Sequence, residues 1–370
     1  MAAAVRGPAV AELEIDLGAI AANYALLRER ARPAETAGVV KADAYGLGLA
    51  PVARTLHDAG CRRFFVARLD EGVALRRLLA EAEIFVLDGV GRGEEETVFA
   101  HRLVPVLNHS GELELWSGYA RRLERPLPAA IHLDTGMTRL GFSGAEAAAV
   151  DADALAPLDL RLVMSHLACA DEPEHPLNAA QLRRFLELAA RFPGIPRSLA
   201  ASSGIFLGDA YRLELCRPGV ALYGVNPVPG RPNPLRPVVR LVAPVLQVHV
   251  IDAPGTVGYG ATYPVRPGMR IATVPVGYAD GILRSASNRA TARIGGIEVP
   301  YAGRVSMDLI GLDVTALPAA AAAPGTPVEL LGGPDGVDRL AAQAGTIGYE
   351  VLTRLGHRFR RRYLAPKDPA

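Results

Sequence analysis

The chain has 370 residues, half of them hydrophobic, which is long enough for two domains with a sizeable buried core. Its 40 lysines and arginines nearly balance its 39 aspartates and glutamates, so a net charge of +1 creates no field that would gather nucleic acid or an anionic membrane. We therefore expect a small-molecule partner, and no nucleic-acid or membrane partner.

The cysteines and the first residues both favour a cytoplasmic protein. Cys61, Cys169 and Cys216 are an odd, scattered set without a CxxC pair, which argues against a disulfide framework and against a zinc site. No apolar core of a secretory signal precedes Glu12, and no later stretch is apolar enough to span a bilayer. We expect no bound metal.

The first two thirds of the chain alternate short apolar runs with helical stretches rich in Ala, Leu and Arg. This pattern is typical of a parallel sheet covered by helices. Helices are predicted, for example, over 69–80 and 179–192. Eight strands with helices between them favour a (β/α)8 barrel over a doubly wound sheet. The eight strands are predicted at 37–41, 64–67, 84–87, 103–107, 129–133, 160–164, 198–201 and 213–215.

Beyond about Pro244 the pattern becomes that of antiparallel strands. Residues 245–250 alternate apolar and polar side chains, and turns rich in Gly and Pro recur after them. The sequence thus predicts an α/β fold with two domains. A (β/α)8 barrel covers 11–243, and a mainly antiparallel β-domain, with which residues 1–16 could pair, covers 244–370.

Lys41 is the most informative residue, because it ends the apolar run of the first predicted strand and leads into a turn that contains Gly46 and Gly48. A buried ammonium loses hydration, and this lowers its pKa toward that of a free amine suited to Schiff-base chemistry. Taken alone, a lysine at a strand end more often extends its ammonium to solvent. The residues that follow the other strands favour the first interpretation.

Reactive side chains follow several other predicted strands. Active sites of such barrels lie at the carboxyl ends of the strands, so these residues converge on one rim. Taken singly, each has a structural explanation: His166 could cap a helix, and Arg139 could pair with Asp134. Their joint placement favours an active site. They are Lys41 and Tyr45 after the first strand, 134–139 after the fifth, Ser165 and His166 after the sixth, 202–204 after the seventh, and 217–223 after the eighth.

These residues lie in motifs that resemble, in order and over nearly the whole chain, those of the alanine racemase family. A lysine motif alone would indicate only the wider group of pyridoxal phosphate barrels, whereas five or more ordered motifs indicate this family. The motifs are VVKADAYGLG at 39–48, HLDTGMTRLG at 132–141, SHLACAD at 165–171, RPG at 217–219, GYGATY at 258–263, GYADG at 277–281 and GRVSMD at 303–308.

The resemblance implies that Lys41 binds pyridoxal 5′-phosphate covalently in a barrel followed by a β-domain, within a homodimer. It also implies phosphate contacts from Tyr45, Ser203, Gly219 and Val220, whose hydroxyls and backbone N–H groups suit a phosphate.

The resemblance further implies that Arg217 faces the pyridine nitrogen and that His166 is hydrogen-bonded to Arg217. An arginine stays cationic and donates hydrogen bonds, so it cannot stabilise a protonated ring nitrogen. The substrate carbanion is then less delocalised, which discourages transamination and favours reprotonation.

Racemisation requires proton exchange on both faces of the substrate Cα, and therefore two bases. By resemblance Lys41 serves one face, and Tyr259, contributed by the other subunit's β-domain, serves the other. Arg139 and the backbone near Met307 would hold the substrate carboxylate, and Tyr278 would line the entrance. The implied reaction interconverts L-alanine and D-alanine and supplies D-alanine for peptidoglycan.

Three positions depart from the family pattern. His132 stands where many relatives have a lysine modified to a carbamate, so we predict that an anion such as chloride, or a different acidic side chain, positions Arg139. Ser306 replaces a cysteine at the entrance. His357 stands where a tyrosine is common, and we leave it outside the site.

Other functions remain open at this point. A broad-specificity or serine racemase would share every catalytic residue and differ only in pocket volume. A fold-related decarboxylase would have a carboxylate in place of Arg217. A non-catalytic pyridoxal phosphate carrier would resemble the barrel alone, whereas this chain keeps a β-domain with Tyr259. The motifs do not separate a biosynthetic from a catabolic role.

Overall fold

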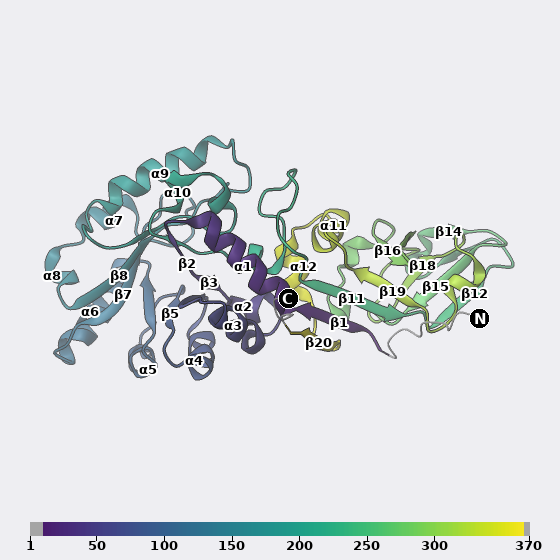
Figure 1. The fold of residues 1–370 in the computed structure, drawn as a ribbon, viewed down its shortest axis with the longest axis horizontal. Coiled ribbons are helices and arrows are strands. Elements are labelled where there is room, and N and C mark those ends of the chain that lie inside the picture. The colour runs from purple at the N-terminus through teal and green to yellow at the C-terminus, as the bar shows by residue number, and fades with distance from the viewer. Residues whose placement is uncertain (1–9, 366–370) are drawn as a thin grey trace. The chain divides into compact units, whose positions relative to one another are not determined.

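The structure, a computed structural model, describes residues 10–365. These residues form two compact units, and the boundary near the start of the chain falls inside α1 (Leu17–Ala31). The first unit contains residues 20–222 and 226–235, and the second contains the rest. Figure 1 shows parallel strands with helices in the first unit and mostly strands in the second. Within residues 10–365, no helix has the length and apolar character that a membrane span requires.

The first unit is built on a parallel sheet of seven strands in the order β3-β4-β5-β6-β7-β8-β9. Their inner residues are almost all buried and apolar, because helices cover one side and the barrel interior the other. The strands are β3 (Gly38–Val39), β4 (Arg63–Val66), β5 (Glu83–Val86), β6 (Val104–Leu107), β7 (Leu127–His132), β8 (Leu158–Met164) and β9 (Arg197–Ser198).

A further strand pair closes this sheet into a ring. β2 leads directly into β3 and pairs in parallel with β10. Beside this pair, the N–H of Ala37 donates to the carbonyl of Cys216 at 2.9 Å. On the other side of β10, the N–H of Arg217 donates to the carbonyl of Ala200, just beyond β9, at 2.9 Å. The predicted (β/α)8 barrel is thereby confirmed. The bounds are Glu35–Thr36 for β2 and Leu215–Cys216 for β10.

The helices of the first unit follow the strands in turn (Figure 1). The helix predicted over 179–192 begins three residues earlier at Pro176, because proline at the first helical position has a suitable φ and lacks only an N–H that would stay unpaired. The bounds are α3 (Leu49–Asp58), α4 (Leu69–Leu78), α5 (Glu95–Ala100), α6 (Ser110–Arg122), α7 (Gly144–Ala149), α8 (Ala152–Leu155), α9 (Pro176–Ala189) and α10 (Asp209–Arg212).

The first strand ends before the predicted Lys41. β3 ends at Val39, and Lys41 begins a short turn, α2 (Lys41–Tyr45). The four residues 42–45 all have φ between 53° and 57°, in the left-handed region. This conformation costs a residue other than glycine roughly 1–2 kcal/mol. Contacts from the surroundings must therefore hold the turn that follows Lys41.

The second unit is mainly antiparallel, as predicted. It contains a six-stranded sheet in the order β17-β16-β19-β11-β1-β20, a three-stranded sheet β12-β15-β18 and the pair β13-β14. The one parallel pairing among its described strands joins β1 and β20. The bounds are β1 (Glu12–Asp16), β11 (Val239–Pro244), β12 (Gln247–Val250), β13 (Gly255–Val257), β14 (Tyr263–Val265), β15 (Arg270–Val274), β16 (Thr291–Ile294), β17 (Ile297–Pro300), β18 (Ile310–Asp313), β19 (Pro327–Leu331), β20 (Arg360–Leu364), and the helices α11 (Gly336–Ala344) and α12 (Gly348–Arg354).

Strand β1, from the start of the chain, lies between β11 and β20 in the six-stranded sheet. Leu13 and Ile15 are fully buried, because alternate residues of a strand point to opposite faces and theirs faces the core. Glu12 and Glu14 lie on the other face.

That other face carries a charge ladder, a row of side chains with alternating charge that crosses all six strands. Arg240 contacts Glu14 at 3.4 Å and Glu329 at 2.7 Å, so that it joins strands β1 and β19 through β11. The strand register sets Arg293 opposite Glu329. In strand order the ladder is Glu298, Arg293, Glu329, Arg240, Glu14 and Arg362.

We predict that Glu14→Gln lowers the free energy of unfolding by about 1–2 kcal/mol at low salt and by less at high salt. Only 14% of the Glu14 side chain is exposed, and the change leaves two arginines without their shared carboxylate. Urea unfolding at two salt concentrations measures the effect. Glu298→Gln is the control, because Glu298 is 48% exposed at the edge of the ladder and should cost less than about 0.5 kcal/mol. Equal losses in the two variants would contradict the prediction.

Candidate functional site

Four of the predicted site residues of the first unit come together at the carboxyl ends of the barrel strands. Lys41 follows β3, Arg139 follows β7, His166 follows β8 and Arg217 follows β10. The two arginines both lower the pKa of Lys41 and of His166. The rim of the barrel is therefore a cluster of cationic and titratable groups.

The pKa of Lys41 lies below that of an ordinary lysine. Burial is the largest cause, and the charge of Arg139 acts in the same direction. The carboxylates of Glu71 and Asp88 oppose the shift. A larger fraction of the amine is thus unprotonated near neutral pH, which makes Lys41 a better nucleophile than an exposed lysine.

Arg217 is held in the interior by groups from two neighbouring strands. Only 3% of it is exposed, and burial lowers its pKa to about 10, so it stays cationic at neutral pH. Its guanidinium donates to the hydroxyl of Ser198 and, at 2.6 Å, to the carbonyl of Ser165. The contact with His166 Nδ1, at 3.5 Å, is the longest of the three. Sequence reasoning missed the two serine contacts, because they depend on which strands become neighbours.

The two histidines of the site are neutral. His166 is partly buried, and burial together with Arg217 and Arg139 lowers its pKa well below the ordinary value. The same causes lower the pKa of His132 to about 4. Neither imidazole therefore adds a positive charge to the rim near neutral pH.

Asn108 fixes the tautomer of His132. Its side-chain amide donates to the carbonyls of Leu87 at 3.1 Å and Val106 at 2.8 Å, so its Oδ1 faces His132 Nδ1 at 2.9 Å as an acceptor. The proton of the neutral imidazole must then lie on Nδ1, and Nε2 is left as an acceptor. No sequence pattern indicates Asn108, which follows β6 and lies 24 residues from His132 along the chain.

Arg139 does not pair with Asp134. The Asp134 carboxylate instead accepts three backbone N–H groups of its own loop, from Gly136, Met137 and Thr138, at 2.9 to 3.1 Å. Within residues 10–365, Arg139 has no hydrogen bond or ion pair, and its side chain is exposed. That an anion or a different acidic side chain positions Arg139 stays a prediction.

The residues predicted to contact a phosphate lie around Gly219, beside the turn that follows Lys41, and we call this group the Gly219 cradle. A Cβ on Gly219 would overlap the hydroxyl of Tyr45, so only glycine fits there. Ser203 and Val220 each begin a short 3-10 helix, Ser203–Phe206 and Val220–Tyr223. The hydroxyl of Ser202, which sequence reasoning placed on the rim without a role, accepts the N–H of Gly219 at 2.9 Å. Gly219 therefore makes room for the Tyr45 hydroxyl, and its N–H is already bonded to Ser202.

The remaining predicted residues, Tyr259, Tyr278 and Met307, belong to the second unit and are all exposed, Tyr259 by 72%. Tyr278 and Met307 lie in adjoining loops. The N–H of Tyr278 donates to the carbonyl of Ser306 at 3.0 Å, and a Cβ on Gly277 would overlap the carbonyl of Met307. The close approach of the two loops thus requires glycine at position 277.

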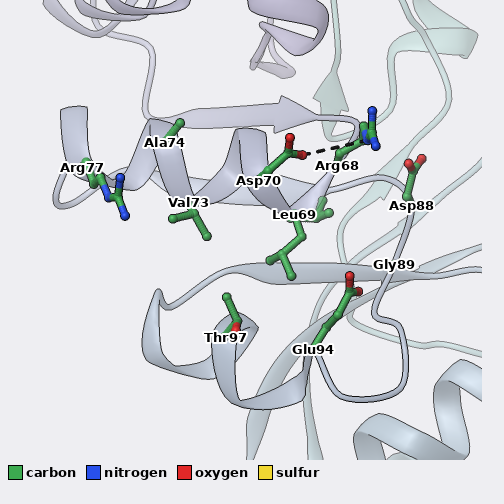
Figure 2. A pocket seen from close by; sticks show the side chains of 11 residues that line it. Arg68, Leu69, Asp70, Val73, Ala74, Arg77, Asp88, Gly89, Glu94 and Thr97 are labelled. Carbon is green, nitrogen blue, oxygen red and sulfur yellow. Dashed lines mark ion pairs between the residues drawn. The ribbon is translucent and has the colours of Figure 1, made fainter.

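A pocket of about 650 Å³ lies against α4 and α5, away from these residues (Figure 2). Its wall mixes apolar and oppositely charged side chains, including an ion pair of Arg68 with Asp70 at 3.9 Å, and contains none of the predicted site residues. We place the chemistry at Lys41 instead, because perturbed titratable groups converge there. Among the described residues, no three His, Cys, Asp or Glu side chains are grouped as metal ligands would be.

The lowered pKa of His132 predicts an acid-dependent loss of stability. Between pH 6.5 and about 4 an unfolded histidine binds a proton that folded His132 does not, so folding loses free energy as the pH falls through this range. At pH 5 this loss is about 2 kcal/mol. His132→Gln removes it, so urea unfolding at pH 7.5 and pH 5 should show a smaller drop in the variant. The same drop in both proteins would mean that His132 titrates normally.

Comparisons with known proteins show which family the chain resembles. A family model of the alanine racemase N-terminal domain matches residues 15–227, and one of the alanine racemase C-terminal domain matches residues 238–363. An alanine racemase of Rhodospirillum rubrum is 52% identical over 359 residues, which are 96% of each chain. A catabolic alanine racemase of Agrobacterium fabrum is 48% identical over 97% of this chain and 94% of its own.

Solved structures give the same result. A crystal structure of alanine racemase from Bartonella henselae with covalently bound pyridoxal phosphate matches with a TM-score of 0.93 at 38% identity, and covers 96% of this chain and 100% of that one. The biosynthetic alanine racemase from Pseudomonas aeruginosa matches with a TM-score of 0.89 at 37% identity, over 96% and 99%. Because both domain models match in order and the relatives span nearly the whole chain, the protein belongs to the alanine racemase family.

Proposed function

We propose that this protein interconverts L-alanine and D-alanine, with pyridoxal 5′-phosphate bound covalently to Lys41. The observation that carries the proposal is the position of Lys41, a partly buried amine of lowered pKa, on the same barrel rim as Arg139, His166 and Arg217. The full-length similarity to alanine racemases supports the choice of substrate.

The residues of the rim fit this cofactor. Lys41 offers the amine, Arg217 offers a fixed cation for the pyridine nitrogen, and Tyr45, Ser203 and Val220 near Gly219 offer hydroxyl and backbone N–H groups that suit a phosphate. When bound, pyridoxal phosphate supplies an electron sink that makes the Cα–H of an amino acid acidic. Arg217, which is cationic because its pKa is about 10, donates hydrogen bonds and cannot stabilise a protonated ring nitrogen, and this disfavours transamination. A decarboxylase would have a carboxylate at this position.

Arg139 suits the substrate carboxylate, because its guanidinium has no partner among the described residues and stands beside two neutral histidines. A carboxylate that binds there would form charge-assisted hydrogen bonds. The backbone N–H at Met307, an exposed residue, and the Tyr278 side chain would complete this end of the site when a second subunit is present.

We further propose a homodimer in which Tyr259 of one subunit serves the second face of the substrate Cα in the other subunit. An aromatic side chain that is 72% exposed supports a role at an interface. The D-alanine product suits peptidoglycan synthesis, although the A. fabrum relative carries a catabolic name, and serine remains an alternative substrate. The cytoplasmic location stays a prediction.

We predict that borohydride reduction of the protein loaded with pyridoxal phosphate attaches the cofactor irreversibly to Lys41. The chain has only one other lysine, Lys367, so peptide mass spectrometry locates the label without ambiguity. Lys41→Arg should remove the label, and Lys367→Arg should leave it unchanged. A label on Lys367, or none at all, would refute the assignment.

We predict that Lys41→Ala and Tyr259→Phe each reduce racemisation by at least about 10²-fold, because each removes one base. If sites are shared between subunits, mixing the two variants under conditions of subunit exchange should restore up to about a quarter of the wild-type activity. Half of the dimers then contain one chain of each kind, and one of their two sites has both bases. Circular dichroism of the alanine solution measures the rate. No recovery in a mixture shown to contain heterodimers would rule out the shared site.

A further inference from the structure

We propose that Glu71 is a positioning residue for Lys41. Its carboxylate holds the left-handed turn over residues 42–45 against the ends of β3 and β4, and thereby sets where the Lys41 amine lies. The inference rests on the proposed function only in assuming that Lys41 binds the cofactor through its amine.

The contacts of Glu71 join two strand ends. Glu71 lies in the first turn of α4, and its Oε1 accepts the backbone N–H of Ala42 at 2.6 Å. Its Oε2 accepts the N–H groups of Ala67 at 2.8 Å and Arg68 at 3.2 Å. Ala42 directly follows Lys41, and Ala67 directly follows β4. One carboxylate therefore ties the turn after Lys41 to the neighbouring strand.

Helix capping explains only part of this arrangement. A glutamate in the first helical turn often accepts the N–H of the residue that precedes the helix, as Glu71 does with Arg68. Glu146 of α7 shows the capping arrangement by itself, because its carboxylate accepts the N–H of Ser143 at 3.0 Å in a reciprocal pair. The bond from Ala42 comes from a separate segment, 29 residues away, and capping does not account for it.

The turn needs an external acceptor at this point. Its own hydrogen bonds include those from Ala44 N–H to the carbonyl of Val40 at 2.9 Å and from Gly46 N–H to the carbonyl of Ala42 at 2.7 Å, and the carbonyl of Asp43 accepts the N–H of Gly48 at 2.9 Å. The N–H of Ala42 finds no acceptor within the turn and bonds to Glu71 instead. Since four residues other than glycine are left-handed here, the turn would relax toward ordinary conformations without such bonds.

Both ends of the turn lie in the site. Lys41 begins it, and Tyr45 ends it with its hydroxyl against Gly219. A shift of the turn would therefore move the Lys41 amine and, at the same time, the contact between Tyr45 and Gly219. The Glu71 carboxylate also acts on Lys41 by its charge and opposes the fall of the Lys41 pKa.

The test uses the cofactor-loaded enzyme with Glu71→Ala and Glu71→Gln, and Glu146→Ala as a control that removes only a helix cap. Hydrogen exchange of the peptide covering residues 40–48 should be fastest in Glu71→Ala and intermediate in Glu71→Gln, since glutamine keeps one acceptor oxygen. It should match the wild type in Glu146→Ala. The dissociation constant for pyridoxal phosphate should rise about ten- to a hundredfold in Glu71→Ala.

The two kinetic constants, kcat and KM, should respond differently to Glu71→Ala. We expect kcat of Glu71→Ala to fall at least about tenfold, because the amine is misplaced, while KM for alanine changes less than about twofold, because Arg139 is untouched. If Glu71→Ala equals Glu146→Ala in exchange, cofactor affinity and kcat, the proposal is wrong. Should Glu71→Ala not fold, unchanged exchange at 40–48 in Glu71→Gln overturns it. A wild-type protein that never captures the cofactor on Lys41 would refute the proposed function, while the exchange data would still decide the role of Glu71.

Discussion

The pairing of β2 and β3 with β10 is the constraint on which the site depends. Hydrogen bonds such as the one from Ala37 to the carbonyl of Cys216 join the first strand of the barrel to the last. Because all barrel strands run in parallel, this closure brings the residues after β3 beside those after β10. Lys41 and Arg217, far apart in sequence, can act together only because the ring is closed.

The closed ring also explains the electrostatics. It gathers Lys41, Arg139 and Arg217 on one rim and removes Arg217 from water, so that burial and mutual repulsion lower the pKa values of Lys41, His132 and His166 together. Neutral histidines limit the repulsion, and Glu71 and Asp88 offset part of it. A rim of this kind gains most from ligands with negative charge, and a phosphate and an amino-acid carboxylate both meet that need.

Sequence reasoning recovered the strands well and the supporting contacts poorly. Buried parallel strands are continuous apolar runs, so β4 and β5, for example, were predicted to within one residue. The left-handed turn after Lys41 was missed, because Ala42 and Ala44 carry no preference for that conformation and the acceptor Glu71 lies in another segment. Motif resemblance indicated candidate residues for a ligand site, whereas Ser198, Asn108 and Ser202 contact those residues and become visible only when strands are placed side by side.

The position of β1 in its sheet has a consequence for biosynthesis. Residues 12–16 leave the ribosome more than 200 residues ahead of their partners in β11 and β20. At ordinary rates of translation the segment waits roughly 10–50 s for β11. During that time it is an unpaired strand with Leu13 and Ile15 uncovered. We expect the acidic residues Glu12, Glu14 and Asp16 to oppose pairing of this segment with a second nascent copy, because like charges repel along an exposed edge.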